Sequence, residues 1–263
     1  MDDGWKRDRA VSPAPRRVQD IDPQRLALLN AGAAQTSTLT QCLAVDFAAL
    51  MRSAVPEVGD DALASIGAIA GTGISKRMAL AAGLIRGRLG DGAVTRLQQH
   101  QSDTVRGWAC FVIGANPALT LEQRLEAIRP LADDPHFGVR EWAWMAVRPH
   151  LAADLKAAIT LLGRWTASRS DRLRRFASEA TRPRGVWCSH IPTLKDNPEM
   201  ALIILEPLNA DPSRYVQDSV GNWLNDAAKD RPDWVRDLCA SWQRKQDSAA
   251  TARICKRALR SID

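Results

Sequence analysis

One short helical pattern recurs along the chain at nearly regular intervals, and it constrains the fold more than any other feature. Each copy begins with an aliphatic residue followed by a polar one, with apolar or small residues three and four places later. The aliphatic residues of the four clear copies lie 34, 34 and 43 positions apart, and a looser copy precedes them; these residues are Ile74, Val105, Val139, Leu173 and Val216. Helical repeats of this length predict an all-α fold, an α-solenoid superhelix of HEAT-like helical pairs. A plain helical bundle whose helices share one packing pattern is the alternative.

The rest of the chain also has a helical period. The sequence lacks the alternating β-branched runs and tight glycine turns that indicate strands. Prolines and glycines divide it into expected helices of about 10 to 15 residues; the dividing prolines are Pro56, Pro117, Pro130, Pro135, Pro149, Pro192, Pro198, Pro212 and Pro232. Residues 1–20 mix both charges with two prolines and have no periodic apolar face. We therefore expect a disordered arm, residues 1–20, followed by one HEAT-like repeat domain, residues 21–263.

Charge and cysteine content narrow the class of partner. A formal net charge of +6 and a pI near 9.4 favour a polyanion such as nucleic acid. The five cysteines are scattered and have no CxxC spacing, which argues against a zinc site and a disulfide framework; they are Cys42, Cys110, Cys188, Cys239 and Cys255. No apolar run reaches the roughly 18 residues of a membrane span. We expect a monomer in the reducing cytoplasm, associated with the nucleoid when bound to DNA, with no metal and no membrane segment.

Three acidic residues occupy related positions in the repeat. Counted from the aliphatic residue of its own repeat, Glu141 lies at +2, Glu179 at +6 and Asp226 at +10. Steps of four residues rotate by only about 40° around an α-helix, so the three acids lie on one flank of equivalent helices. Equivalent helices of a solenoid stack side by side, so these acids can converge. Trp223 and Leu224 would anchor the helix that carries Asp226.

A single carboxylate on a helix is most simply a solvated group. Here, however, all three acids are surrounded in sequence by arginines and tryptophans. Acids inside a basic, aromatic groove are unsuited to binding phosphate alone, because like charges repel. Such a groove indicates a site for something cationic.

Three motifs carry a resemblance to a known family. The runs FGVREWAWMAVRPH (137–150), RRFASEATRPRGVW (174–187) and NWLNDAAKDRPDWV (222–235) resemble the AlkC branch of the HEAT-like alkylpurine DNA glycosylases. The resemblance implies a superhelix that wraps duplex DNA and removes cationic N-alkylpurines, notably 3-methyladenine. By motif, it places the catalytic acids at Glu141, Glu179 and Asp226.

The resemblance implies an aromatic contact with DNA, and the positions of basic residues suggest phosphate contacts, with a solvated basic face as the alternative for some of them. Trp187 would contact the deoxyribose of the lesion, and Trp144 is a second aromatic candidate. Five basic residues lie on or next to the helices of the acids and are expected to contact phosphates, since guanidinium suits phosphate geometry; they are Arg140, Arg175, Arg182, Arg184 and Lys229.

The chemistry of such an excision needs no cofactor. An N-alkylated purine carries a positive charge and leaves without a proton donor, and its departure creates an oxocarbenium-like sugar that carboxylates stabilise. One acid can also position or deprotonate the attacking water. The sequence therefore predicts a base-excision-repair enzyme that releases 3-methyladenine, and 7-methylguanine more weakly, from duplex DNA. A HEAT-repeat protein that binds damaged DNA without cleavage is the alternative, and a protein–protein scaffold is a third possibility.

Overall fold

The computed structural model describes residues 17–185 and 187–262. Across these ranges the secondary structure is helical, with no strand, which confirms the all-α prediction. Most of the expected disordered arm lies outside the described residues, and its last part, Val18–Asp20, forms a 3-10 helix directly before the first α-helix. No helix in the described part of the chain is both long and apolar enough to cross a membrane.

The described residues form sixteen α-helices in chain order. They are α1 (Pro23–Asn30), α2 (Leu39–Ala44), α3 (Phe47–Ala54), α4 (Asp60–Ala68), α5 (Ile74–Leu89), α6 (Ala93–Gln98), α7 (Asp103–Ala115), α8 (Leu121–Ala132), α9 (Phe137–Ala153), α10 (Leu155–Gly163), α11 (Asp171–Glu179), α12 (Pro192–Asp196), α13 (Leu202–Leu205), α14 (Arg214–Ala228), α15 (Pro232–Lys245) and α16 (Ala249–Leu259).

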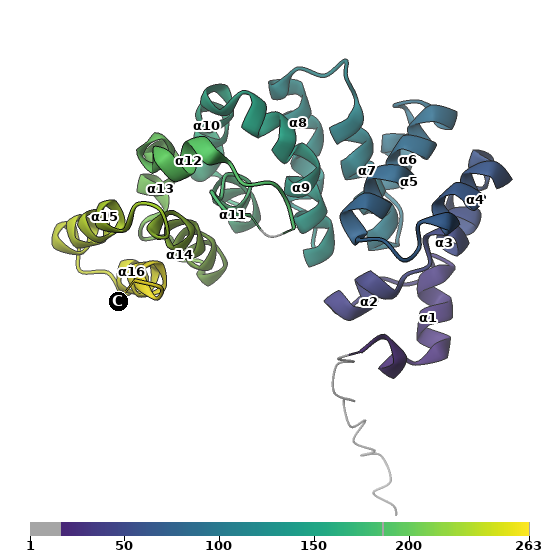
Figure 1. The fold of residues 1–263 in the computed structure, drawn as a ribbon, viewed down its shortest axis with the longest axis horizontal. Helices are drawn as coiled ribbons and strands as arrows, with labels where there is room; N and C mark the ends of the chain where they lie inside the picture. The colour runs from purple at the N-terminus through teal and green to yellow at the C-terminus, as the bar shows by residue number, and fades with distance from the viewer. Residues whose placement is uncertain (1–16, 186, 263) are drawn as a thin grey trace, which may run out of the picture.

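These helices follow one another along a curved superhelix (Figure 1). One row consists of α5, α7, α9, α11, α14 and α16, in which each helix packs against the next. A second set, α6, α8, α10 and α15, packs on that row and completes the helical pairs. The two ends of the chain, α1 with α2 and α16, lie on either side of the open part of the arc (Figure 1).

The aliphatic residues that defined the repeat lie in the core. Val105, Val139 and Val216 are fully buried, and Leu173 is 5% exposed. Each lies in the first turn of a helix of the first row, so the repeating pattern correctly identified the equivalent helices. Close packing between α7 and α9 depends on Gly107, because a Cβ at that position would lie 2.5 Å from Trp142 Cδ1.

Two of the expected helix-breaking prolines lie inside helices. Pro130 is in the last turn of α8, and Pro149 is in the final third of α9. A proline near the end of a helix removes only one backbone donor there. The residues that follow them, Leu131 and Leu151, are buried, and their packing favours continuing the helix.

Trp223 and Leu224 anchor α14 as the sequence predicted, since both are fully buried. The indole Nε1 of Trp223 also donates to the carbonyl oxygen of Thr181 at 3.0 Å. This bond ties the middle of α14 to the chain just after α11. The helices that carry Glu179 and Asp226 are therefore held together by core packing and by a buried hydrogen bond.

Candidate active site

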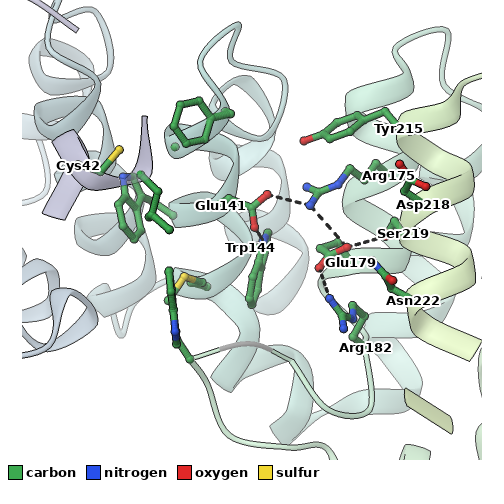
Figure 2. Close-up of a pocket in the computed structure, with 16 residues that line it drawn as sticks. Cys42, Glu141, Trp144, Arg175, Glu179, Arg182, Tyr215, Asp218, Ser219 and Asn222 are labelled. Atoms are coloured by element: carbon green, nitrogen blue, oxygen red, sulfur yellow. Dashed lines mark hydrogen bonds and ion pairs between the residues drawn. The ribbon is translucent and has the colours of Figure 1, made fainter. Parts of the chain in front are cut away.

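A pocket of about 460 Å³ lies between α2, α9, α11 and α14 (Figure 2). Carboxylates, guanidiniums and hydroxyls from α11, α14 and the loop after α11 form one side of it. Apolar and aromatic side chains from α2 and α9 form much of the other. The residues that line it include Leu39, Cys42, Phe137, Glu141, Trp142, Trp144, Met145, Arg175, Glu179, Arg182, Trp187, Tyr215 and Ser219.

The three predicted acids are connected by two arginines. Arg175 Nη2 lies 2.8 Å from Glu141 Oε1 and 3.5 Å from Glu179 Oε2. Arg182 Nη1 lies 2.9 Å from Glu179 Oε1, and its Nη2 lies 2.9 Å from Asp226 Oδ2. Negative and positive groups therefore alternate along one line across three repeats. Figure 2 shows the part of this line that faces the pocket.

Glu179 lies at the centre of the line. It is 5% exposed and accepts a hydrogen bond from Ser219 Oγ at 2.7 Å. Burial acts to raise the pKa of this carboxyl, but the charges of Arg175 and Arg182 outweigh it and hold the pKa below its ordinary value. Glu179 is thus a desolvated carboxylate that stays ionised.

Asp226 lies behind Arg182 and is not among the described residues that line the pocket. It is 4% exposed, and burial raises its pKa although Arg182 and Lys229 oppose the shift. The structure therefore brings the three acids into one network, with Glu141 and Glu179 at the pocket and Asp226 one guanidinium further away.

The two predicted tryptophans occupy different environments. Trp144 is 3% exposed, and its Nε1 donates to Glu141 Oε2 at 2.8 Å. It therefore orients an acid, and little of its ring is open to solvent. Trp187 is 56% exposed and lines the pocket. Its backbone has φ = 58°, the left-handed region that non-glycine residues rarely adopt.

A buried arginine holds the loop that carries Trp187. Arg148, 2% exposed on α9, donates to the carbonyl oxygens of Ala180 at 2.8 Å and Arg182 at 2.6 Å. It also reaches the carbonyl oxygen of Ser189, with Nε and Nη2 both at 3.2 Å. A Cβ on Gly185 would lie 3.2 Å from Arg148 Cζ, so the loop wraps closely around this guanidinium.

The basic residues expected to contact phosphates mostly have partners within the protein. Arg175 and Arg182 are largely buried between the acids, with side chains 13% and 11% exposed. Arg184 forms a forked pair with Asp230, with Nη2 2.8 Å from Oδ1.

The other two basic candidates are placed differently. Arg140 Nη1 donates to the carbonyl oxygen of Asp134 at 2.7 Å, and its Nε donates to Tyr215 Oη at 3.0 Å. Lys229 remains 45% exposed, 3.8 Å from Asp226. Of the five candidates, Lys229 is the one whose charged end is most accessible.

Sequence reasoning missed several residues of this site, among them Tyr215, Ser219 and Arg148. Tyr215 stacks under two guanidiniums, with its ring centroid 4.4 Å from the Cζ of Arg175 and 5.1 Å from that of Arg140. Ser219 was missed as a donor to Glu179, and Arg148 as the support of the loop. Tyr215 is the only tyrosine of the chain and directly precedes Val216, the aliphatic residue of its repeat. This position could have marked it as a candidate site residue.

Within the described residues, no three histidine, cysteine, aspartate or glutamate side chains are placed to hold a metal ion. The chemical groups that this site offers are carboxylates, guanidiniums, hydroxyls and aromatic rings. Two of its carboxylates are nearly excluded from water, which is the setting in which fixed charges act most strongly.

Comparisons with known proteins identify the family of the chain. Residues 119–260 match the family model of the DNA alkylation repair enzymes. The uncharacterized protein YhaZ of Bacillus subtilis is 39% identical over 117 residues, which are 44% of this chain and 32% of that protein. The matched family segment contains Glu141, Glu179 and Asp226.

Several solved structures are similar to this fold. The alkylpurine DNA glycosylase AlkC of Pseudomonas fluorescens, bound to DNA containing an abasic site analog, matches with a TM-score of 0.66 and 26% identity. The match covers 82% of this chain and 60% of that one. AlkD2 of Streptococcus mutans has a TM-score of 0.55 and 25% identity, covering 83% and 94%. The protein smu.31 of Streptococcus mutans UA159 has a TM-score of 0.54 and 26% identity, covering 80% and 93%.

This chain thus spans less than two thirds of YhaZ and of AlkC. The family model nevertheless covers more than half of the sequence, and the helical superhelix is that of AlkC and AlkD2. The chain belongs to the DNA alkylation repair enzyme family.

Proposed function

We propose that this protein is a DNA glycosylase that releases cationic N-alkylpurines from duplex DNA in base excision repair. We expect 3-methyladenine to be released readily and 7-methylguanine more weakly. The observation that carries this proposal is Glu179, an ionised carboxylate that is 5% exposed and lines a pocket in a repair-enzyme fold. The similarity to AlkC, whose structure was solved with DNA, supports duplex DNA as the partner.

Buried carboxylates suit the transition state of this reaction. As the charged base leaves, positive charge moves onto the deoxyribose, and fixed anions near the sugar lower the barrier. Arg175 and Arg182 hold the acids in place, so no reorganisation is needed when the charge develops.

Each acid has a distinct place in this proposal. Glu141 and Glu179 face the pocket, where one of them also orients the attacking water. Asp226 adds its charge from behind Arg182 and keeps that guanidinium against Glu179. The positively charged base needs no proton donor, so the proposed reaction requires no cofactor.

We assign the contacts with DNA on the basis of exposure. Trp187, the exposed aromatic residue at the pocket, would pack on the deoxyribose of the lesion. Lys229, Arg184 and Arg140 lie toward the surface and would contact phosphates. Arg175 and Arg182 were expected to do the same, but their burial between the acids supports a positioning role instead.

The test is direct. Purified protein is incubated with methylated duplex DNA in excess EDTA, and the released bases are identified by mass spectrometry against a sample without enzyme. Free 3-methyladenine above the spontaneous background is the expected result. A protein that binds damaged DNA without cleaving it would retain the DNA and release no base, and a scaffold would do neither.

A further inference from the structure

Helix α2 closes the pocket on the side away from α14. Leu39 and Cys42, one helical turn apart, are the residues of α2 that line it. Figure 2 shows Cys42 across the pocket from Ser219 and Asn222. This short helix lies outside the segment that matches the family model, residues 119–260. The acids and the wall opposite them therefore come from distant parts of the sequence.

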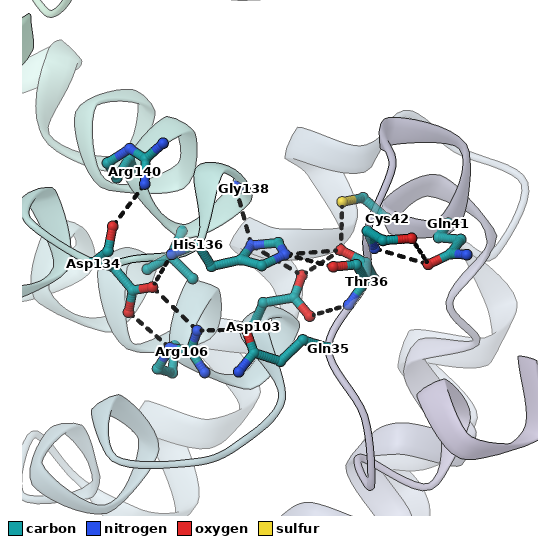
Figure 3. Close-up of polar contacts among 12 residues, drawn as sticks. Gln35, Thr36, Gln41, Cys42, Asp103, Arg106, Asp134, His136, Gly138 and Arg140 are labelled. Atoms are coloured by element: carbon teal, nitrogen blue, oxygen red, sulfur yellow. Dashed lines mark hydrogen bonds and ion pairs between the residues drawn. The ribbon is translucent and has the colours of Figure 1, made fainter. Parts of the chain in front are cut away.

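A buried clasp holds the chain just before α2 (Figure 3). Both the backbone nitrogen and the hydroxyl of Thr36 donate to the carboxylate of Asp103, each at 2.8 Å. The carbonyl oxygen of Thr36 accepts from His136 Nε2 at 2.7 Å. Thr36 is 4% exposed and Asp103 is 1% exposed, so these bonds form away from water, where breaking one of them is costly.

The same histidine caps the N-terminus of α9, the helix that carries Glu141. His136 is the N-cap of α9, and its Nδ1 accepts from the backbone nitrogen of Gly138 at 3.1 Å. Its other nitrogen, Nε2, therefore carries the proton that is donated to Thr36. Cys42 Sγ lies 3.0 Å from Thr36 Oγ1, which fixes α2 to this point as well. The clasp thus sets the distance between α2 and the helix that carries Glu141.

The lining on this side of the pocket is apolar and suits an apolar group of a ligand. Leu39, Phe137, Trp142 and Met145 line it, and they come from α2 and α9 rather than from α11. Such a surface gives no stabilisation to a developing charge but favours contact with hydrocarbon. Leu39 is also 44% exposed, so its end is not fixed within the core.

We propose that α2, positioned by the Thr36–Asp103–His136 clasp, sets the largest N-alkyl group that the pocket accepts, with Leu39 as the residue that meets it. This inference rests on the proposed glycosylase function and adds the determinant of lesion size. The acids act on the sugar of every lesion, whereas Leu39 distinguishes a methyl group from a larger one.

The first test changes only Leu39, an α2 residue that lines the pocket. Duplex DNA is alkylated with either a methyl or a benzyl donor, and released bases are measured by mass spectrometry with spontaneous loss subtracted. Leu39→Ala should raise the ratio of benzylated to methylated purine released by about tenfold, a typical effect of a few carbon atoms in an apolar pocket. Leu43→Ala is the matched control: it lies on the same helix and is 37% exposed, but it is not among the described residues lining the pocket. An unchanged ratio in Leu39→Ala overturns the proposal.

The second test changes the clasp. Thr36→Val keeps the shape but removes the hydroxyl donor to Asp103, whereas Thr36→Ser keeps that donor. The valine variant should raise the same ratio and slow release of methylated purines, and the serine variant should resemble the wild type. A clasp that only stabilises the fold would lower the melting temperature of Thr36→Val and leave the ratio unchanged, which would contradict a positioning role.

The two proposals fail in different ways. If the wild-type protein releases neither base above background, the glycosylase function is wrong, and the inference falls with it. If it releases methylated purines but Leu39→Ala and Thr36→Val leave the ratio at the wild-type value, the function stands and only the role of α2 is wrong.

Discussion

The guanidinium of Arg182 binds the carboxylate of Asp226, with Nε 2.9 Å from Oδ2, across 44 positions of sequence. The same guanidinium donates to Glu179, so one arginine joins acids from two successive repeats. Two buried carboxylates this close would repel each other and take up a proton if nothing lay between them. Arg182 lets the site keep both charges, and it explains how a basic protein can hold acids in its core.

Arg182 should therefore affect catalysis more than DNA binding. Arg182→Gln removes the charge between Glu179 and Asp226, so release of 3-methyladenine should slow by at least about tenfold. The slope of log Kd against log salt should stay unchanged, because this side chain makes no phosphate contact in our assignment. Salt titrations of DNA binding and single-turnover release measure the two effects.

Lys229→Gln is the matched control for that experiment. Its side chain is 45% exposed, so its loss should change the salt slope by about one unit if it contacts a phosphate. A change of about one unit in the salt slope of Arg182→Gln, with release at the wild-type rate, would show that Arg182 contacts a phosphate and does not position the acids.

Asp226 should make folding stability fall as pH rises. Burial raises the pKa of Asp226 above its ordinary value of 3.8, against the opposing charge of Arg182. A raised pKa contributes stability that is fully present below the unfolded pKa and is lost as pH rises through the folded one. Relative to the wild type, the melting temperature of Asp226→Asn should therefore rise as pH rises above about 3.8.

In the same experiment, the stability difference between Glu179→Gln and the wild type should change with pH in the opposite direction. Burial acts to raise the pKa of Glu179, but Arg175 and Arg182 together hold it below its ordinary 4.5. Its stabilising contribution is present above that value and is lost as pH falls through the lowered pKa. The advantage of the wild type over Glu179→Gln should therefore shrink toward acid pH. Equal slopes for the two variants would refute the assigned difference between these carboxyls.

Arg148 should influence excision through the loop of Trp187. Arg148→Lys keeps the charge but loses the forked geometry that reaches three carbonyl oxygens, so the loop should lose its fixed position. We expect slower release of methylated purine by folded protein, with DNA affinity for undamaged duplex little changed. Single-turnover kinetics at saturating enzyme measure the effect.

Arg124→Lys is the control, because Arg124 is a similarly buried arginine remote from the pocket. It is 3% exposed and donates to carbonyl oxygens at the end of α7 and just after it, among them Gly114 at 2.9 Å and Asn116 at 2.7 Å. Both substitutions should lower the melting temperature, but only Arg148→Lys should slow release. Equal release rates in the two variants would leave Arg148 with a purely structural role.

The repeat frame explains which parts of this structure the sequence could predict. Residues at equivalent repeat positions must point the same way, so the burial of Val139 and Val216 followed from periodicity. The same geometry brought Glu141, Glu179 and Asp226 into one network. Nothing in the repeating pattern identified Arg175 and Arg182 as the groups between the acids, although both lie about one helical turn from Glu179.

The wall formed by α2 lay beyond sequence reasoning for a different reason. Thr36 binds Asp103 and His136 at separations of 67 and 100 positions. These residues belong to no shared repeat position, so only the folded chain brings them together. Pro149 failed as a helix boundary because the packing of Leu151 outweighed the loss of one backbone donor.

The single-turnover rate of 3-methyladenine release by wild type and Glu179→Gln tests the central claim most directly. The substitution keeps the size of the side chain and removes the charge that would stabilise the oxocarbenium-like sugar. The account predicts a release rate lower by roughly 10²–10³-fold, the effect of one electrostatic group, with affinity for undamaged DNA equal or slightly higher. Glu199→Gln, at an exposed glutamate, should release base at the wild-type rate. Release by Glu179→Gln as fast as by the wild type would contradict the account.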